Sequence, residues 1–421
     1  MRTGEALGER APDESECQPR PGIRFADGKT AILNRCASEV PGMSDELKRG
    51  LEGVLVAESA LSHVNGQEGQ LIYRGYPIEE LARGASYEEV LYLLWHGHLP
   101  TRSERDQFVE ALAADRALDD RILGVVRELA ALDANSMAAI RTAVSYLAAT
   151  DPEGPDTDPQ DLEVTLRKGR RITAKLPTIL AAFARLREDR EPIEPRDDLD
   201  HATNFLYMLN GEVPDAVLAE TFDAALVLHA DHGLNASTFS AMVTASTLCD
   251  VHGAITSAIG TLSGPLHGGA NQNVMYMLEE VDDAEVEPTE WVQNALAEGR
   301  RIPGFGHRVY KVKDPRAYIL GEMSEELGAA AGDSRWYEYS VAIEEFMAEE
   351  KGIPPNVDFY SATTYYQMGI PIDLYTPIFA VSRVGGWVAH VLEQYEDNRI
   401  MRPRAKYVGP WEQEFVPIED R

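Results

Sequence analysis

The sequence predicts a predominantly helical, all-α fold, and three observations support this. Apolar residues recur every three or four positions through most of the chain after Leu47, which is the period of a helix with one buried face. Strand-like alternation is scarce, and GQLIYRGY at 69–76 is its best example. The sequence contains no internal repeat and no continuous apolar stretch long enough to cross a membrane. At 421 residues, we expect two or three domains, or one large domain carrying a smaller one.

The elements follow one another along the chain. Residues 1–42 are rich in Pro, Gly and charged residues without a sustained period, so we expect a flexible N-terminal tail. Helical spacing is then clearest in four segments: YEEVLYLLWHG at 87–97, RDQFVEALAA at 105–114, RILGVVRELAALD at 121–133 and AVLAETFDAALVLHAD at 216–231. Pro and Gly punctuate them, as in GHLPT and NGEVPD. The acidic, Pro-containing stretches 151–160 and 189–200 are predicted to be exposed loops.

The charge balance is unusual. Lys and Arg number 39 against 70 Asp and Glu, a net charge of −31, and only eight of the basic residues are Lys. Such a surface repels nucleic acid and anionic membranes, so neither is an expected partner. Self-repulsion of this size is relieved by salt, whose screening length is about 3 Å at 1 M. We therefore expect adaptation to a high-salt cytoplasm, and an ordinary acidic enzyme is the alternative.

Cysteine usage indicates a reducing compartment. The three cysteines, Cys17, Cys36 and Cys249, form no CxxC pair and are too few for a disulfide framework. The N-terminus lacks the apolar segment of a signal peptide. A cytoplasmic location is the expectation.

Two adjacent shifts in composition stand out. Residues 233–278 carry a single formal charge, Asp250, although charged residues make up 26% of the chain. The small-residue helices of this stretch are predicted to form the buried centre. Residues 300–316 then contain six cations and one acid, Asp314, a cluster able to hold a polyanion such as a nucleotide-bearing cofactor.

Three of the ten histidines lie in contexts that favour chemistry, although a structural role is commoner for any one histidine. His267 lies in LSGPLHGGAN, where glycines permit a tight turn and close approach of a ligand. A helix predicted to begin near Asn271 would place backbone N–H groups beside this imidazole, lower its pKa and keep it a neutral donor to a carbonyl oxygen. His307 lies inside the basic cluster, and His232 lies between an amphipathic helix and the uncharged stretch.

His229 and His232 have H-x-x-H spacing, which is compatible with a metal site. A metal needs further ligands, and the apolar neighbours of His229 favour a core position, so we predict no metal. Asp358, between Val and Phe in PPNVDFYSATTYYQMG, is either a helix N-cap, the commoner case, or a base of raised pKa. Arg383 and Arg402 lie in uncharged or Pro-rich surroundings that suit a bidentate carboxylate partner.

Five segments in order resemble the citrate synthase family: LSGPLHGGANQNV, PGFGHRVYKVKDPRA, NVDFYSATTYY, VSRVGGWVAH and RPRAKYVG. YRGYPIEELA and FLYMLNG extend the resemblance to roughly residues 47–409, and the pattern is closest to the archaeal and Gram-positive type. Motifs of dinucleotide-binding, P-loop, zincin and serine-hydrolase proteins are missing from the sequence.

The resemblance implies an almost entirely helical homodimer or higher assembly. Residues 43–267 and 370–421 would form a large domain, and residues 268–369 a small lid domain that closes over the substrates. The implied reaction condenses acetyl-CoA with oxaloacetate and water to give citrate and CoA, which begins the tricarboxylic acid cycle; acetyl-CoA is a substrate and no cofactor is implied. The nearest alternative, 2-methylcitrate synthase, uses propionyl-CoA, and one methylene is worth only about 1–3 kcal/mol. A non-catalytic homologue is the other alternative.

Roles follow from the resemblance position by position. His267 matches the histidine that hydrogen-bonds the thioester carbonyl, Asp358 the base that removes a methyl proton, and His307 the histidine that polarises the oxaloacetate ketone. His232, Arg316 and Arg383 match the groups that hold the oxaloacetate carboxylates.

Two further sets of residues follow in the same way. Arg402 matches an arginine that the partner subunit contributes. The residues expected to hold CoA are Arg301, Ile302, Pro303, Gly304, Phe305 and Lys311.

Overall fold

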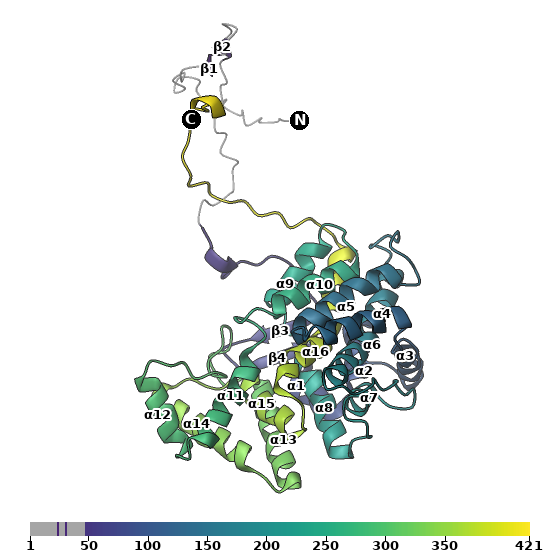
Figure 1. Cartoon of the computed structure of the whole chain (residues 1–421), viewed down its shortest axis with the longest axis vertical. Coiled ribbons are helices and arrows are strands. Elements are labelled where there is room, and N and C mark those ends of the chain that lie inside the picture. Colours follow the sequence, from purple (N-terminus) through teal and green to yellow (C-terminus); the bar gives the residue numbers. More distant parts are fainter. Residues whose placement is uncertain (1–22, 25–29, 32–46) are drawn as a thin grey trace, which may run out of the picture. The chain divides into compact units, whose positions relative to one another are not determined.

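The structure is a computed structural model that describes residues 23–24, 30–31 and 47–421. The chain divides into two units, residues 1–57 with 404–421 and residues 58–403, and each is described by itself. The described residues form sixteen α-helices and five short strands, so the predicted all-α fold class is confirmed (Figure 1). In this part of the chain, no helix combines the length and apolarity that a membrane span requires.

The described residues of the first unit form short elements. Strands β1 (Ile23–Arg24) and β2 (Thr30–Ala31) pair antiparallel, and the remainder of the predicted tail, residues 1–42, lies outside the described residues. Residues 404–421 are irregular apart from one 3-10 turn, Ile418–Asp420. This segment exposes several large apolar side chains: Tyr407, Val408, Trp411, Phe415 and Ile418.

The second unit begins with a small antiparallel sheet of β3 (Ser62–Asn65), β4 (Gln70–Tyr73) and β5 (Tyr76–Pro77). The strand candidate at 69–76 is thus a hairpin rather than one strand. Arg74 and Gly75 join β4 to β5 with φ of 48° and 94°, as a two-residue hairpin turn of this kind requires.

The helices of the second unit form two packed groups (Figure 1). The larger group contains α1 (Ile78–Gly84), α2 (Tyr87–His96), α3 (Arg102–Ala114), α4 (Asp120–Ala131), α5 (Ser136–Thr150), α6 (Leu162–Arg187), α7 (His201–Asn210), α8 (Ala216–His229), α9 (Ala236–Ala245), α10 (Val251–Leu262) and α16 (Tyr375–Glu396). The smaller group contains α11 (Ala270–Asp283), α12 (Pro288–Ala297), α13 (Pro315–Ala331), α14 (Arg335–Lys351) and α15 (Val357–Gln367). All four segments with the clearest helical spacing are helices, namely α2, α3, α4 and α8.

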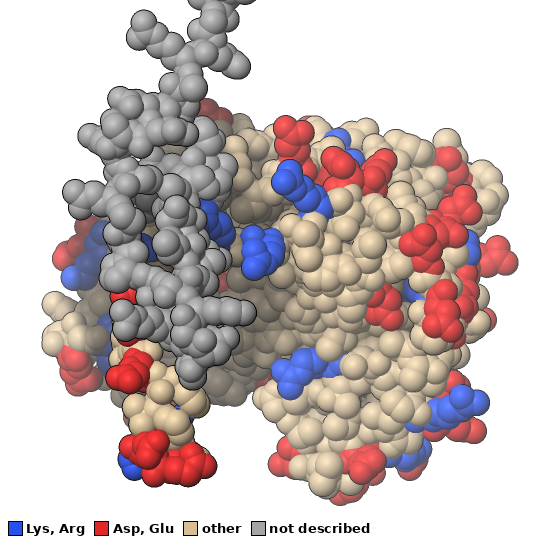
Figure 2. Space-filling model, turned by 90° about the horizontal axis from the view of Figure 1, so that it is seen from above, with Lys and Arg blue, Asp and Glu red and all other residues tan. Residues whose placement is uncertain are grey.

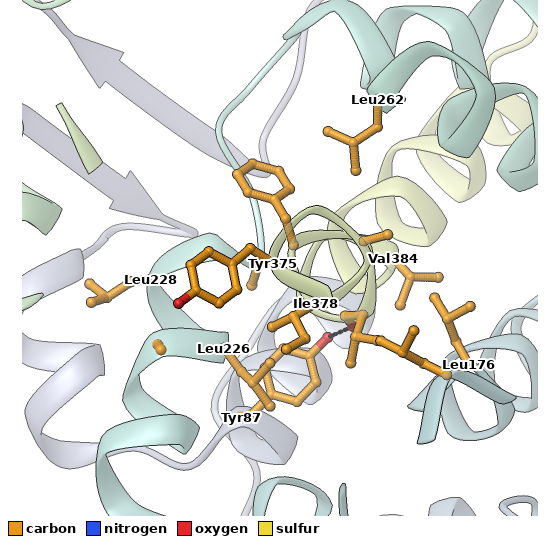
Figure 3. Close-up of a cluster of buried hydrophobic side chains, with 14 of the residues drawn as sticks. Tyr87, Leu176, Leu226, Leu228, Leu262, Tyr375, Ile378 and Val384 are labelled. Carbon is orange, nitrogen blue, oxygen red and sulfur yellow. Dashed lines mark hydrogen bonds between the residues drawn. The ribbon is translucent and has the colours of Figure 1, made fainter. Parts of the chain in front are cut away.

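Helix α16 is the centre of the core. Every residue from Tyr375 to Val391 is buried, as expected of a helix that is covered on all sides. Side chains from α2, α6, α8 and α10 surround it, and Figure 3 labels Tyr87, Leu176, Leu226 and Leu262 among them.

Hydrogen bonds fix the position of α16 along its axis. The Tyr87 hydroxyl donates to the Ser382 carbonyl (2.7 Å), and the Trp95 indole donates to the Gly385 carbonyl (2.9 Å). Gly386 donates its backbone N–H to the carbonyl of Ala230 (3.1 Å). A Cβ at Gly386 would collide with that carbonyl, so glycine is needed for this close approach. These contacts place α16 against the C-terminal end of α8.

Two predictions about surface and core are wrong in part. The uncharged stretch 233–278 is not wholly buried, because α9 and α10 leave one row of side chains half-buried, including Phe239, Val243, Thr256 and Thr261. The stretch 151–160 is a loop, yet it is held to α6 rather than free. Its Asp151 carboxylate is buried and pairs with Arg171 (2.8 Å), because cations spaced along α6 face it. The stretch 189–200 is an exposed or half-exposed loop, as predicted.

The acidic residues lie mainly on the surface. Figure 2 shows acidic side chains spread over much of the visible face, with Lys and Arg side chains among them. Among the described residues, the excess of acidic side chains therefore lies largely at the solvent-exposed surface.

Candidate active site

The turn that follows α8 carries His232 and is held rigidly from three sides. The Asp231 carboxylate accepts hydrogen bonds from the Gly233 backbone N–H (3.1 Å), from the His390 ring (3.1 Å) and from the Ser62 hydroxyl. Burial alone would raise its pKa, but His390 and the nearby charge of Arg383 lower the pKa of Asp231 to about 2. An ionised carboxylate thus anchors the residue next to His232.

His232 and His307 face each other. Their ring centroids lie 5.4 Å apart, although the two residues are 75 positions apart in sequence. His307 accepts hydrogen bonds at Nδ1 from the backbone N–H groups of Val309 (2.9 Å) and Tyr310 (3.1 Å), so its proton must lie on Nε2. Burial lowers the pKa of His307 to about 4, and Arg316 contributes in the same direction. His307 is therefore a neutral ring that presents an Nε2–H donor.

The loop that carries His307 is attached to the segment that leads into α15. The Asn356 backbone N–H donates to the Gly304 carbonyl (2.9 Å), and the Asn356 amide donates to the Gly306 carbonyl (2.9 Å). Gly304 has φ of 81°, and a Cβ there would lie 2.7 Å from Val274 and 2.8 Å from Phe359. There is therefore no room for a side chain at residue 304. The loop that carries His307 packs closely against the start of α15.

Asp358 lies in the first turn of α15, and the N-cap alternative is wrong for it. The cap is Asn356, whose side-chain oxygen accepts from the Asp358 backbone N–H (3.0 Å). No hydrogen bond to the Asp358 carboxylate is formed within the described part of the chain. Burial raises its pKa to about 6, against the attraction of Arg316 and Arg383. This is the environment of a general base that works near neutral pH.

His267 lies in the turn between α10 and α11 and is oriented by the start of α9. Its Nε2 accepts from the Ser237 backbone N–H (3.3 Å) and lies 2.8 Å from the Ser237 hydroxyl. A nitrogen that accepts from a backbone N–H carries no proton, so the ring proton lies on Nδ1. Burial lowers the pKa of His267 to about 4, and Arg383 adds to this effect. His267 is thus a neutral donor through Nδ1.

The helix expected to orient His267 is the wrong one. A helix does begin beside Asn271, since α11 starts at Ala270. The N–H group at the ring nevertheless belongs to Ser237, in the first turn of α9. The sequence could not reveal this contact, because 30 residues separate Ser237 from His267 and the fold alone brings them together.

Two buried arginines supply the positive charge of the site. Arg316 is paired with Asp314 through two hydrogen bonds, Nε to Oδ1 (3.0 Å) and a terminal nitrogen to Oδ2 (2.7 Å). Arg383 is 1% exposed, donates through Nε to the His229 carbonyl (2.6 Å) and lies over the Phe379 ring. No carboxylate of the described residues forms an ion pair with Arg383. A buried guanidinium without a directly paired carboxylate is costly even with the Asp231 charge nearby, so Arg383 fits a position for an anionic ligand.

The predicted site residues largely come together. The charge of Arg316 acts on His232, His307 and Asp358, and the charge of Arg383 acts on His232, His267 and Asp358. His229 is fully buried in the core and donates through Nδ1 to Ala225, as its apolar neighbours predicted. No cluster of three or more metal-ligating side chains occurs in the described part of the chain. Arg402 does not join this group; it is exposed.

The basic cluster is smaller than its sequence implies. Arg300 pairs with Glu280 (2.7 Å), Lys313 pairs with Glu344 (2.6 Å), and Arg316 pairs with Asp314. The two glutamates come from α11 and α14 and are distant in sequence, which is why the cluster looked uncompensated. The cations that keep an exposed side chain without an ion pair among the described residues are Arg301, Arg308 and Lys311.

The segment expected to hold CoA combines buried and exposed positions. Ile302 and Gly304 are buried, Pro303 is half-buried, and the Phe305 ring packs on Phe359 (centroids 4.6 Å apart). Arg301 is exposed at the start of the segment. The backbone of this segment is therefore fixed by packing and presents its cations to solvent.

Two residues of the site escaped the sequence analysis. Ser237 orients His267, and Tyr310 contacts His232 through its hydroxyl (3.2 Å). A serine in NASTFS and a tyrosine in HRVYKV are ordinary residues in their local context, so no local signal distinguishes them.

Fold and site together define a helical acid–base enzyme with a buried site for an anionic substrate. The family model described as "Citrate synthase, C-terminal domain" matches residues 50–404. The citrate synthase of Haloferax volcanii is 68% identical over 379 residues, which cover 90% of this chain and all of the relative. A 2-methylcitrate synthase of Mycobacterium tuberculosis is 41% identical, covering 88% of this chain and 93% of the relative.

A solved structure agrees with these sequence matches. The citrate synthase of Thermoplasma acidophilum, solved as a ternary complex with carboxymethyl coenzyme A and oxaloacetate, is 32% identical with a TM-score of 0.83. The match covers 90% of this chain and all of that one. The chain belongs to the citrate synthase family.

Proposed function

We propose that this site condenses acetyl-CoA with oxaloacetate and water to give citrate and CoA, the reaction of the family to which the chain belongs. The function is that of a citrate synthase, an acyltransferase that converts the acyl group into an alkyl group on transfer. One observation supports the assignment of residues, namely the arrangement of the ionisable groups. The Asp358 carboxylate, with a pKa of about 6, and the neutral imidazole of His267 lie near the buried guanidinium of Arg383, and the neutral imidazole of His307 lies near that of Arg316.

The first half-reaction needs both Asp358 and His267. A methyl proton next to a thioester is too weakly acidic for a carboxylate acting alone, so the developing oxyanion must be stabilised as the proton leaves. In our proposal the Asp358 carboxylate takes that proton, and the Nδ1–H of His267 donates to the thioester oxygen. Because His267 is neutral, it can donate this hydrogen bond without transferring its proton.

The second half-reaction needs a polarised ketone. The Nε2–H of His307 would donate to the ketone oxygen of oxaloacetate while the methyl carbon attacks the ketone carbon. Arg383, Arg316 and His232 would hold the two carboxylates. Citryl-CoA then reacts with water; its C–S bond breaks and citrate and CoA leave. Water must be excluded until the C–C bond has formed, which favours a site that closes on oxaloacetate first.

The CoA portion is assigned to the segment after α12. Arg301, Ile302, Pro303, Gly304 and Phe305 would line its path, and Lys311 would meet its phosphates. The fixed backbone and the unpaired, exposed cations of this segment support the assignment.

We assign the lid to residues 268–369, with residues 43–267 and 370–421 as the large domain. His307 and Asp358 would then belong to the small domain and Arg383 to the large one, so that closure assembles the site. The packing of α11 and of α13 on α15 supports this division.

The assay that tests the function measures thiol release from acetyl-CoA with a colorimetric reagent, with and without oxaloacetate, in molar KCl. Propionyl-CoA is run in parallel, because the alternative, 2-methylcitrate synthase, differs by one methylene. We expect release that requires oxaloacetate and prefers acetyl-CoA; the lower identity of the 2-methylcitrate synthase relative supports this choice. A preference for propionyl-CoA would reassign the substrate, and no release from folded protein would overturn the catalytic assignment.

We further propose a homodimer in which Arg402 completes the partner's oxaloacetate site. Three features support it: the uncharged, half-buried row on α9 and α10, the apolar side chains of residues 404–421, and the exposed position of Arg402. A surface row without charges is typical of an interface between copies of one chain.

Arg402→Ala should therefore raise the KM for oxaloacetate about 10-fold or more, the usual cost of removing a charged hydrogen bond. Mixing it with an inactive Asp358→Asn variant should restore part of the activity, because hybrid dimers regain one intact site. Sedimentation checks that hybrids form. Hybrids without recovered activity would contradict a site shared between subunits.

We also propose a cytoplasmic protein adapted to high salt, supported by the net charge of −31 and by the similarity to the Haloferax volcanii relative. The midpoint of thermal unfolding should fall by 10 °C or more, as an order of magnitude, when KCl is lowered from about 2 M to about 0.1 M, because charge repulsion is then less screened. Calorimetric scans across KCl concentrations measure this. A midpoint independent of salt would contradict the adaptation.

A further inference from the structure

Tyr310 contacts both histidines that face each other in the site. Its hydroxyl lies 3.2 Å from Nε2 of His232, and its backbone N–H donates to Nδ1 of His307 (3.1 Å). Its ring centroid lies 4.8 Å from that of His307 and 5.5 Å from that of His232. The residue is 2% exposed. One residue thus acts on two rings that come from separate parts of the fold.

The hydrogen bond between Tyr310 and His232 joins two neutral groups. Burial raises the pKa of the Tyr310 phenol, and burial together with Arg316 lowers the pKa of His232, so both groups are neutral. The only acceptor that the described residues offer to the Tyr310 hydroxyl proton is Nε2 of His232. With the phenol as the donor to Nε2, the imidazole proton lies on Nδ1.

The loop around Tyr310 rests on the turn between β3 and β4. The backbone N–H of Lys311 donates to the Gly66 carbonyl (2.8 Å). A Cβ at Gly66 would collide with the Val309 carbonyl, so only glycine permits this contact. Gly69, with φ of 67°, also lies close to this loop, since a Cβ there would lie 2.8 Å from the Val312 side chain. Residues 309–312 therefore pack closely on the β3–β4 turn, which is the seat of this loop.

We propose that Tyr310 is a positioning residue of the oxaloacetate site, seated by the β3–β4 turn at Gly66. Its hydroxyl holds His232 in the tautomer that presents Nδ1–H to a substrate carboxylate, and its backbone holds His307 with Nε2–H toward the ketone. This inference rests on the proposed function, because it takes oxaloacetate to be the substrate that binds at this site.

Tyr310→Phe removes the hydroxyl and keeps the ring. We expect the KM for oxaloacetate, and its Kd measured by titration calorimetry, to rise about 3- to 10-fold, the range of one neutral hydrogen bond. The KM for acetyl-CoA should stay within about twofold, because the phenol acts on the oxaloacetate histidine alone. Tyr318→Phe is the matched control; Tyr318 is exposed on α13, and its variant should match the wild type.

Gly66→Ala tests the seat independently. It should also raise the KM for oxaloacetate. In the double variant with Tyr310→Phe, the fold-increase in this KM should be smaller than the product of the two single increases, because both substitutions act through one loop. Gly84→Ala is the control, since a Cβ there meets open space.

The outcomes separate cleanly. Wild-type affinity of Tyr310→Phe for oxaloacetate would overturn the inference, and so would an equal loss for both substrates with a lowered unfolding midpoint, which would indicate a structural role. Failure of the wild-type protein to release CoA in the presence of oxaloacetate would instead overturn the proposed function.

Discussion

Asp358→Asn should lower kcat by about 10²- to 10⁴-fold, the range expected when a general base is removed. The amide keeps the shape of the side chain but has no basic oxygen that can take the methyl proton. The cap on α15 is provided by Asn356, so the substitution leaves the helix start intact. Steady-state kinetics with acetyl-CoA and oxaloacetate measure the loss.

The pH dependence of the wild type should report the same group. The Asp358 carboxylate must be ionised to act as a base, and burial raises its pKa to about 6. Log kcat/KM, which reports the ionisation of the free enzyme, should therefore fall with a slope of one as the pH drops below about 6. His267 and His307, with pKa values of about 4, stay neutral through this range and contribute no second slope. A profile flat down to pH 4.5 would contradict the assignment.

The thermal stability of Asp358→Asn provides the control. The ionised Asp358 carboxylate lowers the stability of the folded state, whereas most ionised aspartates raise it. The pKa of Asp358 is raised in the folded state, so its ionised form is disfavoured by folding, and this cost is present above pH 6 and absent below pH 4. The cost is at most roughly 3 kcal/mol, at about 1.4 kcal/mol for each pKa unit. Asp358→Asn should therefore unfold at the same or a higher temperature than the wild type at pH 8. An inactive variant that unfolds earlier would leave its loss of activity explained by misfolding.

Much of the fold could be predicted because helical periodicity is a local property. The segments at 87–97 and 216–231 form helices α2 and α8, as their three- and four-residue apolar spacing predicted, and the Ser86 capping box marks the start of the first. The sheet was harder to predict. β3 has two partly buried polar residues in four, and its pairing with β4 is set by the turn at Gly66 rather than by alternation. Strand pairing is a relation between two segments, so a single segment carries little of the signal.

The site residues also differ in whether their local sequence or only their long-range contacts identify them. His267, His307 and Asp358 have distinctive neighbours, so each could be selected from its own segment. The electrostatics could not be predicted, because Glu280 and Glu344 neutralise two cations of the basic cluster only after α11 and α14 have packed. The same holds for Ser237 and Tyr310, whose function lies entirely in contacts with distant residues.

His267→Ala should lower kcat by about 10²- to 10³-fold, the loss expected when one preorganised donor to an oxyanion is removed. The turn around His267 should survive, because it is held by groups other than the imidazole. The Thr376 hydroxyl donates to the Gly268 carbonyl (2.9 Å), and the His267 backbone N–H donates to the Gly264 carbonyl (2.9 Å). Calorimetric titration should therefore find oxaloacetate binding close to that of the wild type.

Ser237→Ala tests the supporting hydroxyl of Ser237 separately from the His267 imidazole, which is the donor. The variant loses the hydroxyl 2.8 Å from Nε2 but keeps the backbone N–H that sets the tautomer, so His267 still presents its proton on Nδ1. We expect kcat to fall only about 2- to 10-fold, as for one neutral hydrogen bond. The buried Trp387 indole also loses its acceptor, so the unfolding midpoint should fall. If Ser237→Ala were as slow as His267→Ala while remaining folded, the hydroxyl rather than the imidazole would be the group on which the thioester depends.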